Sequence, residues 1–139
     1  MTYLGPALVA WGIAQLTKLV VHSVRQRRLD LRILASMGGF PSSHSALVMA
    51  LTAVIARLNG VGSPLFALAL IFSVVVMYDA AGVRRAAGHQ AAVLNRLIDD
   101  LFQHRRIAEQ RLRELLGHTP IEVFAGAALG VAVGILFTL

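Results

Sequence analysis

GGFPSSHSA, residues 38–46, decides how this chain folds, because it ends a basic connection and opens a long apolar run. Glycine, proline and serine favour turns and helix starts, and the apolar residues that follow reach about Leu58. Ser42, Ser43 and His44 therefore stand at the start of a helix, where we expect lipid to end and water to begin. Hydroxyls and an imidazole at that boundary suit a phosphate-bearing lipid.

The composition indicates a membrane protein. Of the 139 residues, 57% are hydrophobic and 14% charged, whereas a soluble domain has roughly 25% charged residues. The length allows one domain, residues 1–139. The lack of cysteine excludes disulfides and thiolate metal sites. In a membrane chain a net charge of +6 favours anionic lipid over nucleic acid, so the expected partners are the bilayer and no nucleic acid.

Four apolar stretches predict membrane helices, since a bilayer core needs about 20 helical residues. The second is short and would need residues 39–43 as a buried lead-in. The expected fold is all-α: a small integral membrane helix bundle with about four membrane helices. A cytoplasmic amphipathic helical connection, residues 84–120, joins the third and fourth, because its leucines fall at helical spacing. The stretches are Leu4–Val24, His44–Leu58, Pro64–Val83 and Ile121–Leu139.

The distribution of the arginines predicts the orientation of the protein in the membrane. The connections at residues 25–37 and 84–120 hold eleven arginines, whereas the connection after the second stretch holds only Arg57. Cytoplasmic loops carry the excess of basic residues. We therefore expect a protein of a bacterial-type plasma membrane, with both long connections in the cytoplasm and both termini outside.

Three glycines in the last stretch, Gly126, Gly130 and Gly134, are four residues apart. Such a row of small residues lets another helix backbone approach closely. The row predicts either close packing within the bundle or a contact between two copies.

Polar side chains converge on the cytoplasmic side from four separate segments, and such a gathering suggests a site. Lysine and arginine can hold phosphate oxygens, and serines at a helix start add an anion site. One imidazole can attack phosphorus and a second can protonate the leaving alkoxide. This set needs no metal. Its members are Lys18, Arg25, Ser42, Ser43, His44, Asp79, Arg84, Arg85, His118 and Glu122.

Structural roles for the same residues stay open. Lys18 can snorkel to the interface, and Arg25 can act in topology alone. Ser42 and Ser43 can be a helix cap, and Glu122 can interact with a helix dipole. The remaining alternatives are a capping role for His118 after Gly117 and an ion pair of Asp79 with Arg84 or Arg85.

Three segments carry a resemblance to a known family. GGFPSSHSA, DAAGVRRAAGHQAAVLN and LLGHTPIEVFAG, in this order, resemble the divergent type 2 phosphatidic acid phosphatase family, which is related to acid phosphatases and vanadium-dependent haloperoxidases. The likeness covers nearly the whole chain. It implies a membrane lipid phosphatase acting on phosphatidic acid, phosphatidylglycerophosphate or a polyprenyl phosphate or diphosphate through a phosphohistidine. The alternative is a non-catalytic lipid-phosphate binding or transport protein.

The wider superfamily has Lys-x6-Arg-Pro, Pro-Ser-Gly-His and Arg-x5-His-x3-Asp elements. Lys18 and Arg25 match the first, although Gln26 replaces its proline. The second matches Pro41, Ser42 and His44, with Ser43 in place of glycine. The third matches at His118, with Glu122 replacing aspartate and Leu112 replacing arginine, beside Arg111 and Arg113 one residue out of register.

The resemblance implies a role for each of these residues. His118 would be the nucleophile, Glu122 its orienting partner and His44 the general acid. Arg84 or Arg85 would supply the missing guanidinium. No cofactor is expected, although Asp79 and Glu122 could together bind magnesium. Because the chain is shorter than the usual six-helix lipid phosphatase, we also expect self-association. Phosphate binding is assigned to Lys18, Arg25, Ser42 and Ser43.

Overall fold

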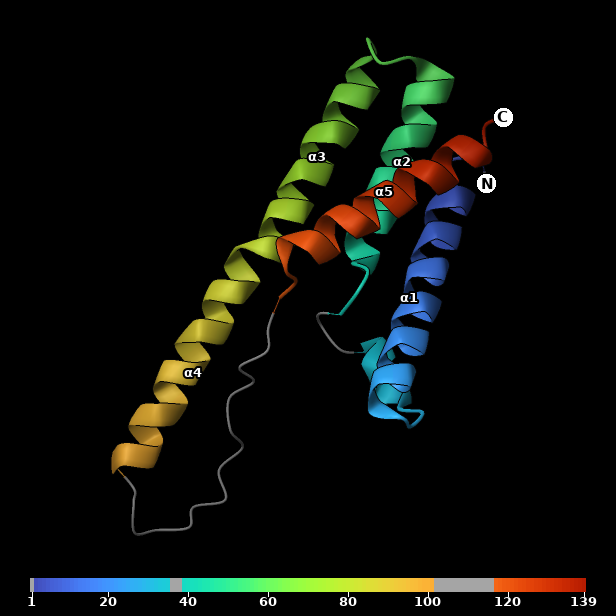
Figure 1. Ribbon diagram of the computed structural model, residues 1–139. Coiled ribbons are helices and arrows are strands. Elements are labelled where there is room, and N and C mark those ends of the chain that lie inside the picture. The colour runs from blue at the N-terminus through green and yellow to red at the C-terminus, as the bar shows by residue number, and fades with distance from the viewer. Residues whose placement is uncertain (1, 36–38, 102–116) are drawn as a thin grey trace.

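The computed structural model is helical in all the regular structure of the residues that it describes, 2–35, 39–101 and 117–139 (Figure 1). The side chains of residues 35, 83–85 and 98–101 are outside this description. This confirms the all-α part of the expected fold class. The elements in chain order are α1 (Leu4–Gln26), the short 3-10 helix η1 (Leu31–Ala35), α2 (Ser43–Asn59), α3 (Pro64–Ala81), α4 (Val83–Leu101) and α5 (Pro120–Leu136).

The glycine row joins α5 to α2. A Cβ added at Gly126 would collide with the backbone of Ser42, and one added at Gly130 would collide with the backbone of Ala46. At Gly134 it would lie 2.7 Å from the Ala50 carbonyl oxygen. Of the two expectations for this row, the structure therefore has the packing within the bundle. In Figure 1, α5 crosses α2 obliquely.

Small side chains also fill the centre of the bundle, where α1 packs against α2 and α5. Alanines let the helix axes approach closely, so the core depends on backbone proximity more than on large apolar side chains. Its members are Ala7, Ala10, Ala14, Ala46, Ala50 and Val133.

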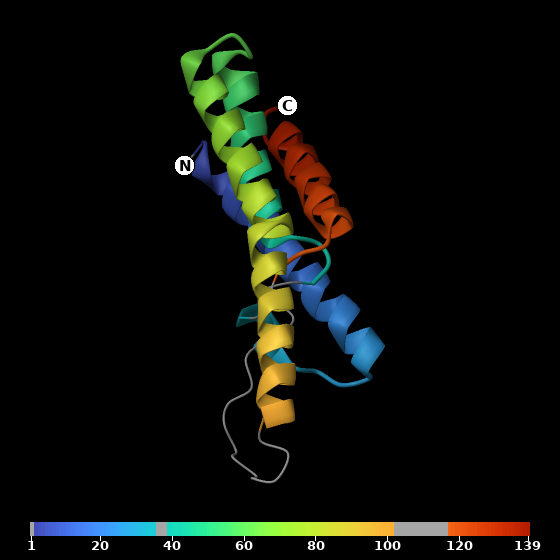
Figure 2. The ribbon, with the colours of Figure 1, turned by 90° about the vertical axis from the view of Figure 1, so that its left-hand side faces the viewer.

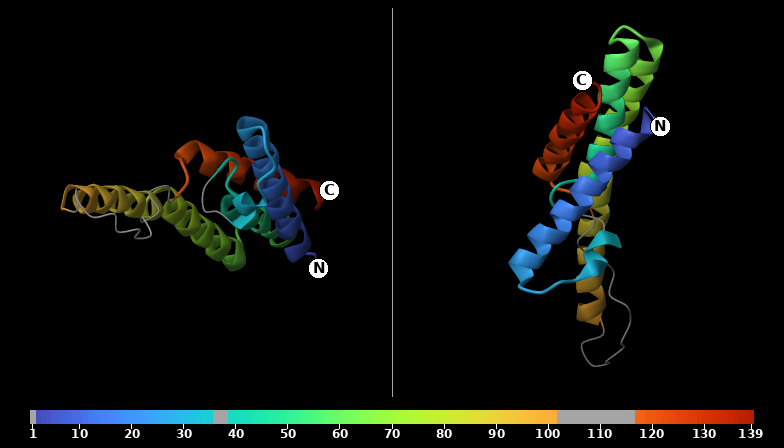
Figure 3. Two further views of the ribbon diagram at one scale, coloured as in Figure 1. Left: turned by 90° about the horizontal axis from the view of Figure 1, so that it is seen from below. Right: turned by 90° about the vertical axis from the view of Figure 1, so that its right-hand side faces the viewer.

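Polar bonds join α2 to α3 near the middle of both helices, and another joins the start of the chain to the end of α2. The hydroxyls of Thr52 and Ser73 lie 2.8 Å apart, and both are buried. Both termini and the turn between α2 and α3 lie at the same end (Figures 1 and 3). There the Tyr3 hydroxyl donates to the Asn59 side chain.

The chain continues from α3 into α4 through Gly82, whose backbone is right-handed helical. α3 and α4 consequently form a long rod, and α4 extends beyond the other helices (Figures 2 and 3). The predicted amphipathic connection is helical to Leu101. The part of that prediction at residues 102–116 lies outside the described residues.

Two helical stretches, Leu4–Gln26 and Pro64–Leu97, are long and apolar enough to cross a membrane. The helices α2 and α5 have 17 residues each, which corresponds to about 25 Å. α5 ends at Leu136, three residues before the predicted end. The short helix η1 was not predicted. The structure thus supports membrane association, and the number of crossings stays a prediction.

Candidate functional site

The start of α2 is bonded to the start of α5. Ser42 is the N-cap of α2, and its hydroxyl accepts hydrogen bonds from the Ser45 backbone N–H at 3.3 Å and the Ser45 hydroxyl at 3.1 Å. The Ser42 N–H donates to the backbone carbonyl of Glu122 at 2.9 Å. Ser42 and Ser43 are both buried. The capping role considered for Ser42 is therefore present, and it places two predicted site segments side by side.

A capping box forms the start of α5. The Thr119 hydroxyl accepts from the Glu122 N–H, and the Glu122 carboxylate accepts from the Thr119 N–H at 2.9 Å. His118 lies just before this helix, two residues ahead of Pro120. Its N–H donates to the Ala80 carbonyl of α3 at 2.9 Å. Backbone bonds thus fix the position of His118 between α3 and α5.

The His118 ring is paired with Glu122. Its Nδ1 lies 3.2 Å from Glu122 Oε2, and the side chain of His118 is only 3% exposed. An ionised carboxylate can only accept, so Nδ1 carries the proton in this bond. In the neutral ring the lone pair then resides on Nε2, the nitrogen that a nucleophile needs.

The second imidazole lies close by. The ring centroids of His44 and His118 are 6.4 Å apart, with the ring planes inclined by 66°. His44 is on the first turn of α2 and is exposed, whereas His118 is buried. One histidine therefore faces the surroundings while the other is held in the protein. The pair lies at the starts of α2 and α5, which are joined by the bond between Ser42 and Glu122.

Lys18 brings a positive charge to the same place. It is 3% exposed although it lies in the apolar helix α1. Its stem packs on Gly39, where an added Cβ would lie 3.2 Å from Lys18 Cγ. Gly39 has φ +94°, a conformation that side chains disfavour. The Lys18 charge interacts with those of Glu122 and His118. Burial at this depth does not fit a lysine that snorkels to the interface.

Burial lowers the pKa of His118 below its ordinary value. The Glu122 carboxylate and a hydrogen bond to the Gly39 backbone act in the opposite direction, and the Lys18 charge adds to the lowering. Since histidine ordinarily titrates near pH 6.5, the ring is predominantly neutral at pH 7. A neutral ring can act as a nucleophile.

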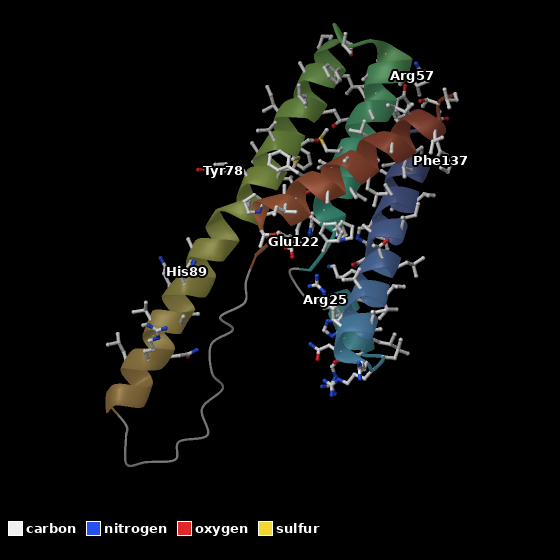
Figure 4. The ribbon with its side chains drawn as sticks, viewed as in Figure 1. Arg25, Arg57, Tyr78, His89, Glu122 and Phe137 are labelled. Carbon is white, nitrogen blue, oxygen red and sulfur yellow. The ribbon has the colours of Figure 1, made fainter. Side chains whose placement is uncertain are left out.

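The other predicted residues are placed less closely. Arg25 is exposed in the last turn of α1. Figure 4 shows Arg25 and Glu122 away from the end of the bundle that holds Arg57 and Phe137. Asp79 is half-buried in the last turn of α3. The side chains of Arg84 and Arg85 lie outside the described residues, as do Arg111, Leu112 and Arg113.

Among the described residues, no three histidine, aspartate or glutamate side chains lie close enough together to hold a metal ion. Magnesium held by Asp79 and Glu122 stays an alternative for experiment.

Two contributions to the site were missed. Thr119 and Glu122 form the Thr-x-x-Glu pattern of a capping box, which the sequence displays and which would have fixed the start of α5. The contact of Gly39 with Lys18 joins residues far apart in the chain, and no local pattern reveals it.

Together, the helices and the buried polar cluster define a membrane-associated helical protein with a candidate phosphate site. The chain belongs to the divergent PAP2 family, whose sequence pattern matches residues 2–133. It is 43% identical over 136 residues to the uncharacterized membrane protein YuiD of Bacillus subtilis (strain 168), covering 90% of this chain and 86% of that protein. No solved structure matches the chain significantly.

Proposed function

We propose that this protein is an integral membrane phosphatase that hydrolyses a lipid phosphate or diphosphate. The observation that carries the proposal is the pairing of His118 and His44 at 6.4 Å beside the buried charge of Lys18. Membership of the divergent PAP2 family supports a phosphatase-related activity. The candidate substrates are phosphatidic acid, phosphatidylglycerophosphate and polyprenyl phosphates or diphosphates.

The proposed topology has four crossings, by α1, α2, α3 and α5. Both termini and the turn between α2 and α3 lie at the same end of the bundle, which is compatible with four crossings. The arginine excess favours a cytoplasmic site. Substrate would then be drawn from the inner leaflet.

In the first chemical step, Nε2 of His118 attacks phosphorus. The incoming phosphoryl group would replace the contact of this ring with the Gly39 backbone. The P–O bond to the lipid breaks, and His44 gives a proton to the leaving alkoxide. Glu122 holds the Nδ1 proton and stabilises the positive ring. The products are the lipid alcohol and a phosphohistidine.

In the second step, water attacks the phosphohistidine. His44, now neutral, takes a proton from the water, and the P–N bond breaks as the P–O bond forms. Inorganic phosphate leaves, and both histidines return to their initial protonation states. Lys18 and Arg25 would balance the charge of the phosphoryl oxygens throughout.

The direct test is phosphate release by the purified protein in detergent, measured across lipid phosphates of different head groups. We expect release without added metal and no effect of a chelator, because the proposed groups need no cation. Loss of activity in chelator and its return with magnesium would support the magnesium alternative. Absence of phosphate release from every lipid phosphate would contradict the enzymatic proposal.

A non-catalytic lipid-phosphate binder is the second candidate. The buried Lys18 favours it as well, since a cation holds phosphate whether or not a bond breaks. Saturable binding of a lipid phosphate by a protein that releases no phosphate would identify this function.

In the pH profile of kcat/KM, the midpoint of the acid limb should lie below pH 6.5, because burial lowers the pKa of His118. Glu122 raises this pKa, so Glu122→Gln should move the limb to lower pH. Lys18 lowers it, so Lys18→Met should move the limb to higher pH. The pH profiles of kcat/KM for the two variants measure these opposite displacements of the acid limb. Identical limbs in the two variants would mean that another group controls the acid side.

A further inference from the structure

An apolar groove of about 310 Å³ lies between α3 and α5, next to the candidate site. Its two walls are stripes at helical spacing, one on each helix. The α3 wall comprises Val74, Met77, Tyr78 and Ala81, and the α5 wall comprises Pro120, Val123 and Phe124.

The groove is continuous with the site at one end. Ala81 follows Ala80, whose carbonyl holds the N–H of His118. On the opposite wall Val123 follows Glu122, the partner of the His118 ring. A group bound at His118 is therefore adjacent to the end of the groove.

The groove is also open to the surroundings. Val74, Tyr78 and Phe124 are 57%, 75% and 68% exposed, whereas Val123 forms a buried floor at 3%. Tyr78 extends outward from α3 at the level where α5 begins (Figure 4). From Ala81 to Val74 the α3 wall rises about 10 Å along the helix. This direction leads away from the site and into the apolar part of the bundle.

We infer that this groove binds one hydrocarbon chain of the phosphate-bearing lipid while its phosphate lies at His118. The inference rests on the proposed function for the identity of the ligand. The surface that these residues expose to the groove is apolar, which suits a chain of methylene groups better than a sugar or a peptide. The volume is at the lower end of the range for ligand sites, so it fits a chain and not a further helix.

Val74→Trp tests the inference, because it fills the end of the groove that is farthest from His118. Its matched control is Val75→Trp, since Val75 is 60% exposed on the same helix and does not line the groove. Against a long-chain lipid phosphate, V74W should lower kcat/KM at least about tenfold, the scale of apolar pocket contacts. Against a short-chain phosphate it should change little, and V75W should change neither. An equal loss on both substrates in V74W would overturn the inference.

A second readout does not depend on catalysis. A lipid phosphate with a photoreactive diazirine on its chain is crosslinked in detergent, and the labelled residues are mapped by mass spectrometry. Labelling should concentrate on Met77, Tyr78 and Phe124 and should fall in V74W but not in V75W. A phosphate-free lipid with the same chain should label these residues less. Equal labelling by both lipids, or equal labelling in both variants, would overturn the inference that the groove binds the lipid chain, even if phosphate release is confirmed. Concentrated labelling without phosphate release would retain the groove and reject the enzyme.

Discussion

Replacement of His118 with alanine is expected to lower turnover of a lipid phosphate by at least about 10³-fold, the scale on which removal of a covalent nucleophile acts. The ring is held by Glu122 at Nδ1 and the backbone by its bond to Ala80, so the nucleophilic nitrogen has a fixed position that alanine cannot supply. His89→Ala is the matched control, because His89 is an exposed histidine on α4. Wild-type turnover by H118A would contradict the mechanism.

Substrates with different leaving groups distinguish the roles of the two histidines. His44→Ala should lower turnover of an alkyl phosphate about 10²–10⁴-fold, the usual contribution of a general acid. In kcat/KM, which reports only the steps up to release of the leaving group, the loss with a nitrophenyl phosphate should be much smaller, because that leaving group needs no proton. H118A should lose activity on both substrates. A radioactive phosphate label trapped by quenching in alkaline denaturant, in which the P–N bond of a phosphohistidine is stable, should appear on wild-type protein and be absent from H118A. Equal losses of kcat/KM by H44A on both substrates would contradict the role of His44 as general acid.

The helices could be predicted where the signal is local. Apolar runs at Leu4–Val24 and Pro64–Val83 gave the positions of α1 and α3, because each helix is identified by its own length and composition. The third stretch was expected to end at Val83, whereas α3 ends at Ala81 and the right-handed helical backbone of Gly82 leads directly into α4. The glycine row indicated a face of α5, but its partner could not be named, because contact with α2 depends on how distant segments pack.

The site could be predicted in its residue types but not in its bonds. The apolar stretches predicted a common membrane depth for Lys18, His44 and His118, and the structure brings these three together. The contact between Gly39 and Lys18 could not be read from spacing, because they lie 21 positions apart in the sequence. The bond of His118 to Ala80 is also a long-range backbone contact, and backbone contacts leave no trace in side-chain patterns.

Gly126 links the packing of the bundle to the chemistry, and Gly126→Ala should damage both. The added methyl would collide with the backbone of Ser42, which cannot move as a flexible side chain can. α5 must then shift away from α2 at the level of the bond between Ser42 and Glu122. Overpacking costs about 1–3 kcal/mol, and a displacement of roughly 1 Å can cost about 10²-fold in rate. Thermal unfolding in detergent and turnover well below the unfolding temperature measure the two effects.

Substitutions at two other glycines distinguish the effect on stability from the effect on turnover. Gly134→Ala meets Ala50 and Ala53 at the far end of the same row, so it should lower the unfolding temperature while turnover of the folded protein changes little. Gly12→Ala has open space around it and should raise helix stability by up to about 1 kcal/mol. A G126A variant with the stability loss of G134A and wild-type turnover would mean that the α2–α5 contact does not set the spacing of the two histidines. Loss of turnover in G126A alone, at a temperature where both variants are folded, is the result that ties this backbone contact to catalysis.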